Sequence, residues 1–158
     1  MAARRHAAVV LCAAFAACGS SLPQNAGWRD PVTGVQVAVD AVEAHPSLRD
    51  HGRMLSVVSP GGAVQCVALH PENGLGVPCN LYRLDAQRLL VVDCDGVWIT
   101  IGTGGEIESR RWCWRRELPR EFLGCFRAER DLVYRLEQGA EPEVYLFKDP
   151  PDGVERGW

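Results

Sequence analysis

The chain has 158 residues, with 20 acidic and 17 basic side chains and a formal net charge of −3 at pH 7. This length suits a single domain, and the lack of a basic excess speaks against a nucleic-acid partner. Hydrophobic residues make up 47% of the chain, which is too many for a disordered protein.

The first segment, residues 1–17, has the pattern of a secretory signal peptide, which we expect to form a helix. Arg4 and Arg5 give it a positive start, and the stretch from Ala7 to Ala17 carries no charge. A basic start, a short apolar stretch and small residues at the exit are typical of exported proteins. An apolar stretch of 11 residues is too short to span a bilayer as a helix, which takes about 20 residues.

The end of this segment, Phe15-Ala16-Ala17-Cys18, resembles the lipobox of bacterial lipoproteins. In that family the signal peptide is removed before the cysteine, and the cysteine sulfur carries a diacylglyceryl group. The resemblance implies that Cys18 is the lipid attachment point, and Gly19 after it implies an outer-membrane anchor facing the periplasm. Residues 18–27 then have the composition of a flexible tether. The alternative is ordinary secretion after Ala14-Phe15-Ala16, which would give a soluble secreted or periplasmic protein.

Residues 28–150 are predicted to form one all-β domain, followed by a loose tail at residues 151–158. Turn residues separate the predicted strands, a type I′ turn is expected at Asp95-Gly96, and one helical turn is expected at 119–126. Many short strands at close spacing predict a small antiparallel barrel or sandwich, built from hairpins and a meander. Alternating or continuous apolar residues predict strands at 35–40, 54–58, 63–69, 88–94, 97–101, 106–114, 132–136 and 143–147.

Seven cysteines are present, and lipidation of Cys18 would leave five in the folded part. Exported proteins meet an oxidising compartment in which disulfides persist. The pairs predicted to close short loops next to strands are Cys66 with Cys79 and Cys113 with Cys125. No pair has CxxC spacing, so a structural role is favoured over redox or metal chemistry.

No metal or cofactor is expected. His45 and His51 only just meet the H-x₃₋₅-H spacing of a zinc site, no CxxC accompanies them, and we interpret them and His70 as solvated loop residues. A hairpin turn explains the Asp-x-Asp-Gly string at 93–96 without calcium. The chain contains no G-x-S-x-G, H-E-x-x-H or P-loop motif, and we therefore identify no enzyme. A catalytic site assembled from dispersed residues stays open.

The most unusual stretch is the basic and aromatic one at residues 110–116. Along a strand Trp112 and Trp114 share one face, whereas Arg111 and Arg115 share the other. One interpretation is a binding surface for a polyanion, such as lipopolysaccharide phosphate, or for a protein partner. The other is a pair of core tryptophans with a solvated arginine face, much of whose charge is neutralised by the glutamates at 106, 108, 117 and 121.

These features predict a lipid-anchored cell-envelope protein with a binding or structural role. Its expected partners are the membrane, through the lipid on Cys18, and an envelope protein or an anionic lipid. One alternative is a periplasmic protein inhibitor, because small lipid-anchored β-barrels that inhibit lysozyme are broadly similar in size, export and disulfide use. A cell-wall hydrolase is a further alternative.

Overall fold

The computed structural model describes residues 27–43, 51–70, 77–93, 96–113, 121–129, 133–142 and 155–157. All regular elements in these ranges are β-strands, which confirms the predicted all-β class. None of the described residues forms a helix that could cross a membrane. The predicted signal peptide, Cys18 and the strand expected at 143–147 lie outside the described residues.

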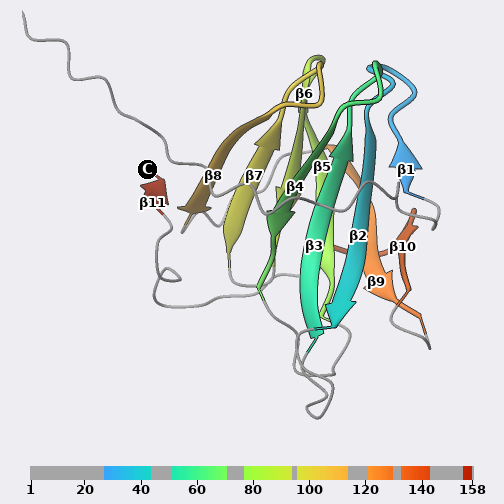
Figure 1. Cartoon of the computed structure of the whole chain (residues 1–158), viewed down its shortest axis with the longest axis vertical. Coiled ribbons are helices and arrows are strands. Elements are labelled where there is room, and N and C mark those ends of the chain that lie inside the picture. Colours follow the sequence, from blue (N-terminus) through green and yellow to red (C-terminus); the bar gives the residue numbers. More distant parts are fainter. Residues whose placement is uncertain are drawn as a thin grey trace, which may run out of the picture.

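The strands form two sheets (Figure 1). The first is an antiparallel meander in chain order, made of β1 (Trp28–Arg29), β2 (Gln36–Glu43), β3 (His51–Val58) and β4 (Val64–Ala68). The second sheet has the order β10-β9-β5-β6-β7-β8-β11. Its strands are β5 (Cys79–Asp85), β6 (Arg88–Val92), β7 (Val97–Ile101), β8 (Ile107–Cys113), β9 (Glu121–Ala128), β10 (Tyr134–Glu137) and β11 (Glu155–Gly157).

The sheets form a sandwich and do not close into a barrel. One isolated bridge, between Asp40 and Val133, links the β2 edge to the segment before β10. The helical turn expected at 119–126 is wrong, because β9 occupies Glu121–Ala128 and pairs with both β5 and β10. The tail expected to be loose contains β11, which pairs with β8 and is parallel to it.

Alternate residues of each sheet meet in the core. The first sheet contributes Val37, Val39, Leu55 and Val57, and the second contributes Leu81, Val91, Ile99, Ile101 and Phe126. All nine are at most 3% exposed, and burial of each such side chain contributes roughly 1.5–3 kcal/mol. The other side of β5 and β6 is buried as well, since Tyr82 and Leu90 are each 1% exposed. Burial on both faces explains the continuous apolar stretch at 89–92.

Three hairpins use the same loop, with three residues between the residues that close it. The closing amides are those of Ser59, Asp93 and Gly102, which donate to the carbonyls of Ala63, Val97 and Glu106. The last loop residue is in each case a glycine with positive φ: Gly62 at 87°, Gly96 at 80° and Gly105 at 81°. A type I turn followed by a left-handed residue is the usual three-residue hairpin loop. The two-residue type I′ turn expected at Asp95-Gly96 is therefore wrong, because the loop already opens at Asp93.

A buried ion pair joins the two sheets. Arg53 on β3 and Asp93 after β6 are 1% and 3% exposed, and Nη2 of Arg53 lies 2.7 Å from Oδ1 of Asp93. The rest of the guanidinium donates to the carbonyls of His70 and Val77, each at 3.0 Å. Oδ2 of Asp93 accepts the amide of His70 at 2.7 Å. Four chain segments therefore meet at this pair.

We predict that Asp93→Asn lowers the free energy of unfolding by about 3–5 kcal/mol, because it leaves the Arg53 charge buried without its partner. Urea unfolding with an unchanged m-value measures this loss. The matched control is Asp85→Asn, which breaks an exposed Asp–Arg pair with Arg88 and should leave stability near that of the original chain. Adding Arg53→Met to Asp93→Asn should recover much of the loss. A double variant as unstable as the single one would contradict this explanation.

Gly105 and Gly62 allow a matched test of the hairpin loops. A Cβ on Gly105 would lie 2.8 Å from Cα of Ser59, whereas a Cβ on Gly62 would meet nothing within 4 Å. Each alanine substitution places an L side chain on a left-handed backbone, which lowers the free energy of unfolding by about 1–2 kcal/mol. Gly105→Ala should cost a further 1–3 kcal/mol, roughly the range for overpacking. Equal losses in urea unfolding would show that the two loops do not press on each other.

Candidate functional site

The predicted binding surface lies on β8, where the structure describes the side chain of Arg111. Arg111 is exposed and stands opposite Trp98, a half-buried residue of β7. Arg110 is exposed as well. Trp112 stands opposite Val97 in the register, but its side chain is outside the described part, as are Trp114 and Arg115. Because successive residues of a strand lie on opposite faces of the sheet, Arg111 shares the face of Trp98, and Arg110 shares the face of Ile99. The part of the predicted surface that can be analysed therefore consists of Arg111 and Trp98.

The glutamates expected to neutralise this surface point elsewhere in the described part of the chain. Glu121 lies 3.2 Å from Nε of Arg83. The carboxylate of Glu106 lies over Gly102 and Gly104, where added side chains would clash with it. The carboxylate of Glu108 lies at the same turn, because a Cβ on Gly102 would stand 2.9 Å from its Oε1. Glu117 is outside the described residues.

Arg110 and Arg111 therefore differ from most arginines of this domain. Arg53, Arg83, Arg88, Arg127 and Arg135 all lie in ion pairs. Within the described ranges, Arg110 and Arg111 form no ion pair, and the same is true of Arg29 on β1. β8 thus carries two such positive charges, one on each face of the sheet, in a chain whose net charge is negative.

The structure does not bring together Cys66 and Cys79, the first predicted disulfide pair. Cys66 stands opposite Ser56 on β3, on the outer face of the first sheet, and its Sγ lies 3.8 Å from Oγ of Ser56. Cys79 belongs to the core between the sheets. The first sheet therefore separates the two sulfur atoms.

The structure does not bring together Cys113 and Cys125, the second predicted disulfide pair, either. Cys125 lies on β9 and Cys113 on β8, with β5, β6 and β7 between them in the sheet. Four strand spacings correspond to roughly 19 Å, whereas the Cα atoms of a disulfide lie within about 7 Å. The two residues are close in sequence, but the chain crosses from one side of the sheet to the other between them.

A row of polar groups crosses the outer face of the first sheet. Oγ of Ser56 lies 3.3 Å from Oδ2 of Asp40, and Cys66 follows on its other side. Burial raises the pKa of Asp40, although the hydrogen bond from Ser56 opposes the shift. Nucleophilic catalysis needs a base beside the hydroxyl or thiol, and the group beside Oγ of Ser56 is the carboxylate of Asp40. Among the described residues no group of three or more potential metal ligands is placed to hold an ion.

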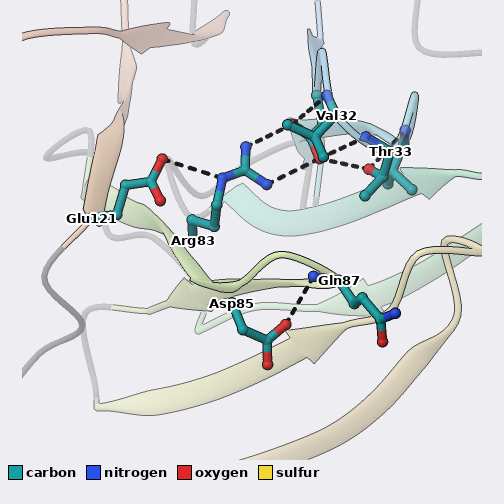
Figure 2. A network of polar contacts seen from close by, with 8 residues as sticks. Val32, Thr33, Arg83, Asp85, Gln87 and Glu121 are labelled. Carbon is teal, nitrogen blue, oxygen red and sulfur yellow. Dashed lines mark hydrogen bonds and ion pairs between the residues drawn. The ribbon is translucent and has the colours of Figure 1, made fainter.

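A second ion-pair network joins the sheets at the other end of β5. Nη2 of Arg83 lies 2.7 Å from Oδ1 of Asp30, a fully buried carboxylate that follows β1. Asp30 also accepts the amides of Val32 and Thr33, each at 3.2 Å, and the Thr33 hydroxyl at 2.6 Å. Figure 2 shows Arg83 between this turn and Glu121. The network fixes the turn before β2 against the second sheet.

Sequence reasoning missed both networks, although the signal was present. Arg53 shares the alternation of Leu55 and Val57, and Arg83 shares that of Leu81. A charged residue at an inward position of a strand must find a partner, because a buried unpaired charge is very costly. The partner itself cannot be named from spacing, since Asp93 and Asp30 lie 40 and 53 residues away in the chain.

Comparison with family models, with curated proteins and with solved structures finds no match for this chain. Its functional interpretation therefore depends on the residues described above.

We predict that Asp30 makes stability depend on pH. Burial alone raises the pKa of this carboxyl, but hydrogen bonds from Arg83, Thr33 and the backbone together lower it from 3.8 to about 2. A lowered pKa stabilises the folded state above the unfolded value, and this contribution is lost as the pH falls through the folded value. The difference in unfolding free energy between the original chain and Asp30→Asn should shrink by about 2 kcal/mol between pH 5 and pH 2.

Urea unfolding at several pH values measures this difference. Asp85→Asn is the control, since the hydrogen bond from Arg88 also lowers the pKa of Asp85 but the pair is exposed. Solvent screening should leave its pH dependence much weaker. A constant difference for Asp30→Asn over the whole range would contradict the assignment.

Proposed function

We propose that this protein is a lipid-anchored cell-envelope protein, whose all-β domain has a binding or structural role. The observation that carries the proposal is Cys18, which ends a signal-like segment in a lipobox-like string. β1 begins at Trp28, ten residues further on (28 − 18). A diacylglyceryl group supplies two acyl chains, and two chains give the stable anchoring that one does not.

The features of the domain support binding rather than catalysis. Its two buried aspartates, Asp30 and Asp93, are each engaged by an arginine and by backbone amides. Both carboxylates therefore serve the fold. The exposed arginines of β8 are instead available to a partner, and arginine is enriched at binding hot spots.

We predict that the mature protein, produced in a Gram-negative host, begins at Cys18 and carries acyl chains. Intact-mass measurement of the membrane fraction tests this directly. In the full chain, Cys18→Ser should abolish acylation and move the domain to the soluble fraction. Cys12→Ser is the matched control, because Cys12 lies inside the signal segment and should leave processing unchanged.

An unmodified chain that begins at Ala17 would contradict the anchor. The soluble inhibitor would then be the better proposal, and protection of cells from lysozyme would test it.

A further inference from the structure

β8 is a long strand whose second edge is only partly used. One side pairs with β7. The other side pairs with β11 at Arg111, Trp112 and Cys113 alone. At the opposite end of β8, the amide of Ile107 donates to Oε1 of Gln65 on β4, at 3.0 Å. Between these two contacts, residues 108–110 have no strand beside them among the described elements. An edge with unpaired backbone groups is a template for another strand.

β11 shows that this edge of β8 accepts a strand. The features of β11 favour its replacement by another strand. β11 has three residues, and its one neighbour in the sheet is β8. It runs parallel to β8, which is the less stable pairing per residue. Figure 1 shows it beside β8 at the margin of the sheet, beyond the end of the first sheet. Short segments with few contacts open at low free-energy cost.

The charges of β8 define what this edge should accept. Arg110 and Arg111 are exposed and, in the described ranges, lie in no ion pair. In the register of the β8–β11 pair, Glu155 stands beside Arg111. The chain's own edge partner therefore brings an acidic residue to the position of an arginine. Opposite charges on neighbouring strands stabilise a pair, whereas like charges destabilise it.

We propose that the edge of β8 is a strand-accepting site for an extended segment of an envelope protein, with an acidic residue beside Arg111. This rests on the proposed binding role in the envelope. The incoming segment replaces β11 and extends along residues 108–113. Main-chain hydrogen bonds provide the affinity and the arginines select the acidic segment, as in other cases of strand addition.

The test uses the full chain carrying Cys18→Ser, so that no acyl group is attached, and a labelled synthetic peptide with the sequence of residues 152–158. In this background Arg156→Pro removes a backbone donor from β11 and leaves the other strands intact. We expect the peptide to bind the Arg156→Pro chain at least about tenfold more tightly than the chain with β11 unchanged, because a linked strand competes at high effective concentration. Hydrogen exchange should slow at residues 108–113 when the peptide binds.

Charge exchange provides the second half of the test. Arg111→Glu should weaken binding of the peptide about tenfold, and a peptide with Lys in place of Glu155 should restore it. Arg29→Glu is the matched control, since Arg29 is also exposed and outside the described ion pairs, but it lies on β1 in the other sheet. Equal effects of the two substitutions would overturn the proposal.

Three other outcomes would also overturn it. The first is the absence of peptide binding to the Arg156→Pro chain. The second is dimerisation of that chain at rising concentration, which would assign the edge to a second copy. The third is binding to phosphatidylglycerol vesicles that Arg111→Glu abolishes, without any peptide binding, which would assign the arginines to a lipid surface. None of these results depends on acylation of Cys18, so each leaves the proposed anchor to its own test.

Discussion

The ion pair between Arg53 and Asp93 constrains how the two sheets meet. Arg53 stands on the inner face of β3, opposite Ala41 on β2. A slip of β3 by one residue would turn Arg53 outward and leave Asp93 buried without its charge partner. A buried ion pair adds little net stability compared with apolar packing, but breaking one is costly. The pair therefore chiefly destabilises structures in which β3 pairs in a wrong register. It also links the start of β3 to the end of β6 and to the segment that enters β5.

The pair between Asp30 and Arg83 imposes the same kind of constraint at the other end of β5. Asp30 belongs to the turn between β1 and β2, and Arg83 lies on the inward alternation of β5. Each network thus joins one sheet to the other, and the apolar core lies between them. Apolar packing alone tolerates many exchanges of similar volume. Two fixed ion pairs at separate ends remove the freedom of the sheets to slide or rotate against each other.

Features that depend on neighbouring residues could be predicted from the sequence, whereas features that depend on contacts between distant segments could not. Local alternation predicted β2 at Val35, Val37 and Val39, and turn residues predicted the hairpin between β3 and β4. The helical turn at 119–126 failed because Pro119 is compatible with a helix start but does not require one. The structure does not bring the predicted cysteine pairs together, because closeness in sequence does not ensure closeness in space. β8 and β9 follow each other in the chain yet lie on opposite sides of β5, β6 and β7.

The predicted binding surface was located by composition, but its significance depends on pairings that composition does not show. Four nearby glutamates suggested that much of the charge on β8 is neutralised. The fold instead directs Glu121 to Arg83, and Glu106 and Glu108 to the Gly102 turn. Cross-strand pairing of distant segments therefore decides whether an arginine is already satisfied. Spacing along the chain could predict the charges but not their partners.

The edges of the second sheet are protected in different ways, and this difference gives β8 its selectivity. β10 has four residues, and its charges are balanced by the pairs of Arg135 with Glu129 and of Arg127 with Glu137. A balanced edge neither attracts nor repels a charged segment. β8 has seven residues and two arginines outside the described ion pairs. Such an edge repels basic strands, including a second copy of itself, and it favours acidic ones. The same two charges can thus prevent self-association and select a partner.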